Sequence, residues 1–438
     1  MLVLTILLSS LVMGVNISPK RDSSAATSAQ ITTTWLDQQL SAWQGATPYP
    51  LIFSDQFTSA SYTNVNNYNT TALDANLNML YSTGAQAIRI DIGYAPWLQN
   101  SQARINEITS VVNNIKAKGD ILVIADAASA TYQTNPEPWT QFKADWITRV
   151  KTLAALYKPD YYIVIKEPGW YAPMVSDATT NSQFQNASDW LALTQQLVDA
   201  VQSVSPNTKI GISVAASDMS AQTAFYDALL TGAVKIPGIS FIGFDIYSIT
   251  AFTNTQQFLQ QYGSGGKAVW IAEAWSGTAN VAIDPSRSSL DTLWIQVLYY
   301  FALEIHAQLV SPFFTDLFSS YSTPPTNSQG LITYFQNRTS VFSEYQKIIA
   351  QNAATVSTTS QTSSSSSTQS GTSTTITSSS SSSTSSSTST SSVVTSSSSS
   401  TSRIPPSKTP TNLILGVAAI VVLLVVIVSV ALVRKRSK

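Results

Sequence analysis

Eight apolar strand patterns alternate with eight helical patterns between residues 48 and 352, and this alternation is the strongest constraint on the fold. Strands separated by helices run parallel in one sheet, and eight such units are the number that closes a (β/α)8 barrel. An open doubly wound sheet is the competing arrangement, but it normally has a glycine-rich phosphate turn after its first strand, which this sequence lacks. We therefore predict an α/β fold of the TIM-barrel type. The predicted strands are 50–55, 85–94, 121–127, 161–167, 209–217, 239–248, 267–273 and 307–318.

Two of these strands end in a glutamate. The stretch 161–170, YYIVIKEPGW, has the composition of a buried strand up to Glu167, and the proline that follows cannot donate to a sheet. The stretch 267–277, KAVWIAEAWSG, repeats the pattern with Glu273. The carboxyl ends of barrel strands meet at one mouth, and a proton donor beside a second carboxylate is what cleavage of a glycosidic bond requires.

The sequence around both glutamates resembles the retaining glycoside hydrolases with a (β/α)8 barrel, a superfamily that includes β-mannanases, endoglucanases, β-galactosidases and endo-β-galactanases. The resemblance covers roughly residues 48–352. Lys-Glu-Pro at 166–168 is similar to the family's Asn-Glu-Pro, and Glu-Ala-Trp at 273–275 is similar to the strand end that carries the nucleophile. The resemblance implies that Glu167 is the general acid/base and Glu273 the nucleophile.

Two further residues support the resemblance, and one departs from it. Arg89, in IRID, takes the place of an arginine that supports the nucleophile, and Tyr247, in FDIYS, takes the place of a tyrosine that hydrogen-bonds it. Lys166 stands where the family has an asparagine that donates to the sugar 2-hydroxyl. Three interpretations are open: Lys166 points away from the site, as strand alternation alone predicts; it binds an anionic sugar; or the barrel has lost hydrolysis.

Other side chains near the predicted strand ends are candidates with structural alternatives. Loop aromatics can stack on sugar faces or cover the core, and this applies to Trp97, Trp170, Tyr171 and Trp275. Aspartates can bond sugar hydroxyls or form ion pairs at the barrel rim, and this applies to Asp91, Asp126, Asp245 and Asp316. For His306, the only histidine, we expect a structural role late in the seventh helix.

The two chain ends carry targeting patterns outside the predicted barrel. Residues 1–20 resemble a secretory signal without a basic n-region, with an uncleaved membrane anchor as the alternative, and residues 21–47 form a polar lead with a capping helix. Residues 353–411 are rich in Ser and Thr and predict a disordered stalk. Residues 413–433 are an uncharged run long enough to cross a bilayer, and the basic tail 434–438 is expected in the cytoplasm. We therefore expect the barrel at the cell surface.

The composition argues against several other classes of protein. The net charge is −1, and basic residues cluster only in the tail, so a nucleic-acid partner is not expected. The chain has no cysteine and no EF-hand or Walker pattern, so we predict no disulfide, no metal and no nucleotide cofactor. Four glycosylation sequons fit an exported glycoprotein, at Asn16, Asn69, Asn186 and Asn337.

The sequence thus predicts a membrane-anchored extracellular glycoside hydrolase that acts on a β-linked poly- or oligosaccharide. The rival hypothesis is a non-catalytic surface protein that binds glycans, or contributes to the cell envelope, on a degenerate glycosidase barrel. Two facing glutamates favour the enzyme, because binding alone does not require them.

The proposed anchor can be tested by truncation. Deleting Leu413 to Lys438 removes the uncharged run and its basic tail, so the protein should be released into the medium. Fractionation of cells and medium with an antibody against the folded domain measures the outcome. Retention of the truncated protein in the membrane fraction would assign the anchor to the N-terminal apolar segment instead.

Overall fold

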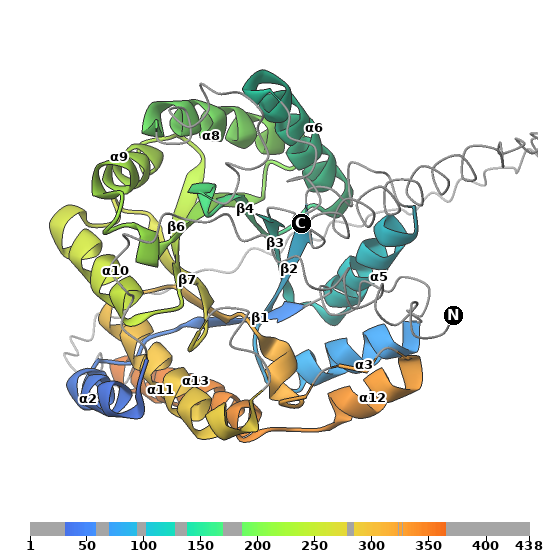
Figure 1. Cartoon of the computed structure of the whole chain (residues 1–438), viewed down its shortest axis with the longest axis vertical. Coiled ribbons are helices and arrows are strands. Elements are labelled where there is room, and N and C mark those ends of the chain that lie inside the picture. Colours follow the sequence, from blue (N-terminus) through green and yellow to red (C-terminus); the bar gives the residue numbers. More distant parts are fainter. Residues whose placement is uncertain are drawn as a thin grey trace, which may run out of the picture. The chain divides into compact units, whose positions relative to one another are not determined.

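Eight parallel strands close a barrel in chain order, as predicted (Figure 1). The computed structural model describes residues 31–57, 70–93, 102–127, 138–169, 186–277, 284–322, 324–325 and 327–364. The strands are β1 Ile52–Phe57, β2 Ala87–Gly93, β3 Ile121–Ala127, β4 Tyr161–Lys166, β5 Lys209–Ala215, β6 Ile239–Ile246, β7 Ala268–Ala274 and β8 Leu309–Pro312. Each strand pairs with the next, and β1 pairs with β8 to complete the ring.

Helices form an outer ring around the strands (Figure 1). Between the strands lie α3 Thr70–Tyr81, α5 Gln102–Lys118, α6 Trp139–Tyr157, α8 Ala187–Gln202, α9 Thr223–Ala233, α10 Ile249–Tyr262 and α11 Ser288–Glu304. Short 3-10 turns are η5 Ala216–Asp218, η6 Pro285–Arg287 and η7 Thr315–Phe318. The predicted capping helix before the first strand is α2, Thr33–Trp43, and its first turn is capped by the Thr32 hydroxyl.

Side chains alternate between the barrel interior and the helix-facing side of the strands. Small or flat side chains fill the bottom of the interior, where the Phe241 and Trp270 rings stack with centroids 3.7 Å apart. The larger core lies between strands and helices and holds the fully buried Trp146, Trp190 and Trp294. The barrel interior is therefore a packed core rather than a channel.

Two strands depart from strict alternation just before their carboxyl ends. On β4, Ile163 pairs with Gly211 and Ile165 with Ile212, so Val164 is an extra residue in the ladder. On β7, Ala272 is the extra residue, because the neighbouring pairs with β6 are made by Ile271 and Glu273. A bulge of this kind re-aims the side chains that follow it.

The differences from the predicted element boundaries include three late in the sequence. β8 ends at Pro312 rather than at residue 318, because proline removes a ladder donor and η7 follows. His306 lies beyond the end of α11, not within the helix, and has a φ of 53°. An additional helix, α12 Ser328–Gln336, precedes α13, and α13 runs from Ser340 to Ser364, past residue 352 where the stalk was expected to begin.

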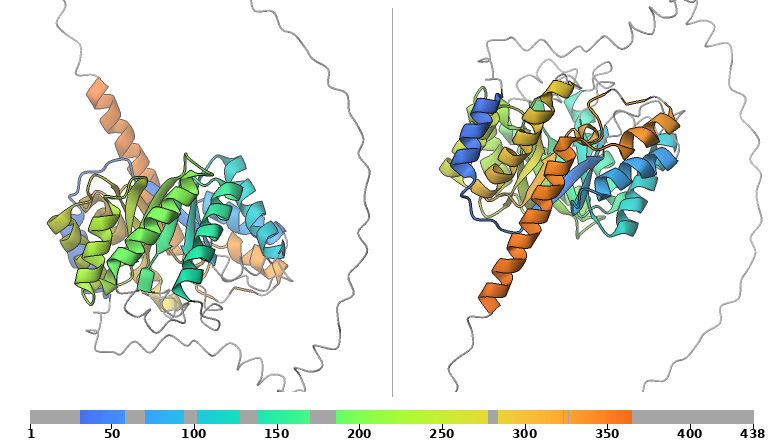
Figure 2. Two further views of the ribbon diagram at one scale, coloured as in Figure 1. Left: turned by 90° about the horizontal axis from the view of Figure 1, so that it is seen from above. Right: turned by 90° about the horizontal axis from the view of Figure 1, so that it is seen from below.

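The last helix leaves the barrel at the amino-terminal ends of the strands. Its first residue, Ser340, contacts Ser288 at the start of α11, and Asn352 bonds Tyr49 and Leu51 just before β1. The rest of α13 then extends beyond the barrel (Figure 2).

The predicted signal at 1–20, most of the predicted stalk, the apolar run 413–433 and the tail 434–438 lie outside the described residues. Among the helices that are described, none is both long and apolar enough to span a membrane.

Candidate active site

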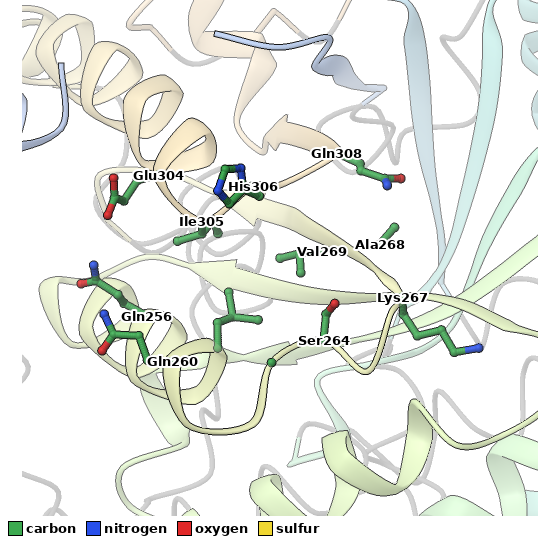
Figure 3. Close-up of a pocket in the computed structure, with 12 residues that line it drawn as sticks. Gln256, Gln260, Ser264, Lys267, Ala268, Val269, Glu304, Ile305, His306 and Gln308 are labelled. Atoms are coloured by element: carbon green, nitrogen blue, oxygen red, sulfur yellow. The ribbon is translucent and has the colours of Figure 1, made fainter. Parts of the chain in front are cut away.

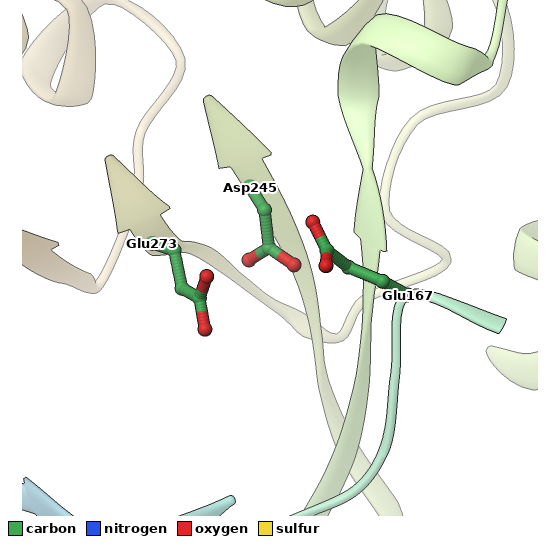
Figure 4. A group of neighbouring side chains, drawn as sticks. All are labelled: Glu167, Asp245 and Glu273. Carbon is green, nitrogen blue, oxygen red and sulfur yellow. The ribbon is translucent and has the colours of Figure 1, made fainter. Parts of the chain in front are cut away.

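Three carboxyl side chains converge at the carboxyl ends of the strands. Glu167 follows β4, Asp245 lies on β6 and Glu273 on β7, and their side chains point into one space (Figure 4). One oxygen from each lies within 4.8 Å of the others. Asp245 and Glu273 are 1% and 2% exposed, so water offers these two carboxyls little stabilisation as anions.

Both oxygens of Glu273 accept hydrogen bonds from neighbouring side chains. Oε1 is contacted by the Arg89 guanidinium and, at 2.5 Å, by the Lys166 ammonium. Oε2 accepts a bond of 2.7 Å from the Tyr247 hydroxyl. Two cations and a hydroxyl donor therefore hold both oxygens of this carboxyl in place.

Arg89 connects this glutamate to Asp91, two residues along β2. Its Nε lies 2.6 Å from Asp91 Oδ1 and its Nη2 lies 3.1 Å from Oδ2, and it also donates to the Ala272 carbonyl. Burial lowers the pKa of Arg89, but Asp91 and Glu273 outweigh it, so the pKa is raised. Burial raises the pKa of Asp91, but Arg89 and Lys166 lower it below its usual range.

Lys166 points into the site, so the expectation that it faces away is wrong. Strict alternation from Tyr161 and Ile163 would turn Lys166 outward, but the extra residue Val164 reverses the alternation. Its Nζ lies 2.7 Å from Asp91 Oδ2 and 4.9 Å from the centre of the Phe313 ring. Burial lowers the pKa of Lys166, but its carboxylate neighbours raise it overall, so this ammonium keeps its proton.

Glu167 has a left-handed backbone conformation, with a φ of 50°. Its N–H donates to the Ser213 carbonyl at 2.9 Å, which holds the turn against β5. Non-glycine residues seldom adopt this conformation, and here it directs Glu167 into the mouth immediately after Lys166. Burial and the adjacent Glu273 raise the pKa of Glu167 to about 8, although Lys166 opposes the shift.

Asp245 is the third carboxyl of the cluster. Its Oδ2 accepts a bond of 3.0 Å from the Ser213 hydroxyl, and its buried Oδ1 has no hydrogen-bond partner among the described residues. Burial, Glu273 and Glu167 together raise its pKa well above the usual range. We assign no metal to the three carboxyls, because Arg89 and Lys166 already supply positive charge at Glu273.

Trp275 lies behind the mouth rather than in it. It is 3% exposed and packs edge-on against Phe314, with ring centroids 6.2 Å apart. Of the two predicted alternatives for Trp275, the structure agrees with the core role and not with stacking on a sugar. Phe313 instead lies beneath Lys166 and edge-on to Tyr247, at a centroid distance of 6.0 Å.

Asp126 faces the helices and not the site, so of its two predicted alternatives the structure agrees with the ion pair and not with contact to a sugar hydroxyl. It pairs with Arg149 of α6 and accepts a bond of 2.6 Å from the Tyr162 hydroxyl. Val123 and Ala125 point into the barrel, so alternation directs Asp126 outward. Asp316 accepts from backbone N–H groups at the start of η7.

Three predicted sugar-stacking residues, Trp97, Trp170 and Tyr171, lie outside the described residues. The sequence prediction did not identify Phe313, Ser213 or Asp218 as site residues. Asp218, in η5, is close enough to raise the pKa of Glu167. Each of the three lies on β5 or in the turn after β5 or β8, and that position was the only signal of a site role.

A cavity of about 390 Å³ lies at the other end of the barrel (Figure 3). Its lining includes Gln256 and Gln260 of α10, Lys267 before β7, and His306. The Tyr49 ring lies 5.8 Å from the His306 ring. The cavity is therefore separate from the cluster of carboxyls.

No protein-family model and no curated protein matches this sequence. Solved structures that it resembles are glycoside hydrolases. A β-glucosidase from Thermotoga maritima in complex with glucoimidazole has a TM-score of 0.45 and 10% identity, covering 61% of this chain and 89% of that chain. The GH53 catalytic domain of Ignisphaera aggregans has a TM-score of 0.46 and 14% identity, covering 70% and 98%. A fungal β-1,4-galactanase has a TM-score of 0.45 and 14% identity, covering 66% and 99%. At such identities, function has to be inferred from the site.

The raised pKa of Glu167 predicts a pH-dependent stability difference. Between its usual pKa of 4.5 and the folded-state pKa of about 8, the unfolded chain loses this proton while the native state keeps it. The free energy of unfolding of the wild-type protein therefore falls as pH rises through this window. Glu167→Gln lacks the titrating carboxyl, so this contribution to the fall is absent in the variant. The free energy of unfolding of the variant, relative to wild type, should rise across the window and level off above about pH 8.

Denaturant unfolding at a series of pH values measures this difference. Glu304→Gln, at an exposed glutamate that ends α11, is the matched control for loss of one carboxylate. If the free energies of unfolding of wild type and Glu167→Gln differ by the same amount at every pH, the raised pKa of Glu167 is contradicted.

Proposed function

We propose that this protein is a retaining glycoside hydrolase. The observation that carries the proposal is the pair Glu167 and Glu273, whose carboxyl oxygens lie within 4.8 Å at the barrel mouth in opposite electrostatic surroundings. Retaining enzymes hold their two carboxyl groups about 5–5.5 Å apart, whereas inverting enzymes need about 6.5–9.5 Å to admit a water molecule. The short separation therefore favours a double displacement.

In the first step, Glu167 donates its proton to the glycosidic oxygen as Glu273 attacks the anomeric carbon. The bond to the leaving group breaks, and a glycosyl ester forms on Glu273. In the second step, Glu167 takes a proton from water, the water oxygen attacks the same carbon, and Glu273 leaves as a carboxylate. The raised pKa of Glu167 suits the first role, because an acid must carry its proton at working pH.

Arg89 and Tyr247 prepare Glu273 for attack. Both donate to its carboxyl oxygens, so they fix its orientation. Burial and the charge of Glu273 raise the pKa of Tyr247 well above its usual range, so its hydroxyl remains a donor. These residues support the nucleophile without touching the leaving group.

We further propose that the enzyme is extracellular, membrane-anchored and active on a β-linked poly- or oligosaccharide. The uncharged run 413–433 would provide the anchor and residues 353–411 most of the spacer. The mouth would then be free to meet a large polymer.

A substrate panel tests the activity. We expect the full-length protein, in detergent, to release reducing ends from at least one of β-mannan, β-glucan, galactan and xylan. Glu167→Gln and Glu273→Gln should each reduce the rate by several orders of magnitude. Binding to one of these polymers without release of reducing ends, at acid and neutral pH, would favour the rival non-catalytic glycan-binding protein.

Azide rescue tests the division of roles between the two glutamates. In Glu167→Ala, a substrate with a good leaving group needs no proton, so added azide should speed the second step and yield a β-glycosyl azide from a β-glycoside. In Glu273→Gly, azide can enter only from the opposite face and should give the α-azide. NMR of the products identifies the anomers, and exchanged anomers would reverse the assignment.

A further inference from the structure

Lys166 is a buried cation that lies between two carboxylates from other strands. Its side chain is 10% exposed, and its Nζ lies 2.7 Å from Asp91 on β2 and 2.5 Å from Glu273 on β7. The flat face of Phe313 covers it from the β8 side. The positive charge of Lys166 is therefore already paired with two carboxylates before any ligand enters.

The charges of the cluster balance around Lys166. Arg89 and Lys166 are positive, and the two carboxylates that they contact, Asp91 and Glu273, are negative. Asp91 contacts both cations. Among the described residues, it forms no hydrogen bond with Glu167 or Asp245. Asp91 therefore compensates the second cation, which would otherwise favour loss of the proton from Glu167.

We propose that Lys166 and Asp91 form a positioning pair: Lys166 holds Oε1 of Glu273, and Asp91 holds Lys166 and balances its charge. This inference rests on the proposed hydrolase function and deepens it. The proposal gives Lys166 a role other than binding an anionic sugar, because its ammonium already forms ion pairs with Asp91 and Glu273. The sugar ring expected at this point of the mouth is therefore uncharged.

Several charged or titratable groups surround Glu167. They are Arg89 from β2, Lys166 from β4, Asp218 from η5, Asp245 and Tyr247 at the end of β6, and Glu273 from β7. Asp91 contacts two of them, Arg89 and Lys166. Replacing Lys166 removes a positive charge from this set, and replacing Asp91 removes the negative charge that pairs with its two cations. The two changes should therefore move the protonation of Glu167 in opposite directions.

The test compares Lys166→Met, Asp91→Asn and the double variant in the full-length protein. The basic limb of the pH profile of kcat/KM reports the pKa of Glu167 as the acid. Lys166→Met should move this limb to higher pH by about 1 unit, and Asp91→Asn should move it to lower pH by about as much. Lys166→Arg keeps the charge and should keep the limb near its wild-type position even if kcat falls. In denaturant unfolding, the double variant should lose less stability than the sum of the two single variants.

Arg149→Met is the matched control, since Arg149 is also a buried cation paired with an aspartate but lies on the helix-facing side of the strands. It should leave the limb in place. Limbs that do not move, or that move equally in the control, would overturn the proposal. So would additive stability losses, or a wild-type enzyme that cleaves only uronic-acid glycosides and loses this preference in Lys166→Met.

A second readout does not depend on hydrolysis. The upper end of the pH window over which Glu167→Gln gains stability relative to its parent should move upward in the Lys166→Met background and downward in the Asp91→Asn background. If no glycoside is cleaved but these shifts occur, the proposed function fails and the positioning pair stands. If cleavage occurs without the shifts, the pair fails and the hydrolase stands.

Discussion

The ion pair between Arg89 and Glu273 is the contact on which the rest of the barrel mouth depends. Arg89 is 1% exposed, and a guanidinium at that depth is stable only with carboxylate partners. Because Arg89 also donates hydrogen bonds to Asp91 and to the Ala272 carbonyl, it links β2 to β7 across the barrel. Loss of one partner from such a buried group typically costs about 3–5 kcal/mol, so selection for a stable barrel also preserves the geometry of the site.

The sequence was sufficient to predict the barrel and the two strand ends that carry glutamates. Those features follow from local patterns, namely alternating strands and helices and a carboxylate placed just before a strand stops. Which side each residue faces near the strand end depends instead on pairing with the neighbouring strand. The extra residues Val164 and Ala272 shift that pairing, and they have no distinctive sequence pattern. The inward direction of Lys166 therefore could not be predicted.

For two other candidates, the structure agrees with the structural alternative and not with contact to a sugar, and the reasons differ. Asp126 was a candidate only through its place near a strand end, yet Val123 and Ala125 on the same strand point inward and direct it to the helices. Trp275 was a candidate as an aromatic after a strand, and its burial behind Phe314 depends on the course of the segment after β8. Proximity to a strand end is thus a weaker criterion than the face of the strand.

The two glutamates differ in their electrostatic surroundings because of where the cations lie, since the residues themselves are chemically alike. Arg89 and Lys166 both reach Oε1 of Glu273, whereas Glu167 and Asp245 share the side of the mouth that these contacts leave without a cation. Burial and the charge of Glu273 raise the pKa values of Glu167 and Asp245, the two carboxyls of the cluster that have no cationic contact among the described residues. A barrel that placed Lys166 one position along β4 would lose this asymmetry, and with it the separation between an acid and a nucleophile.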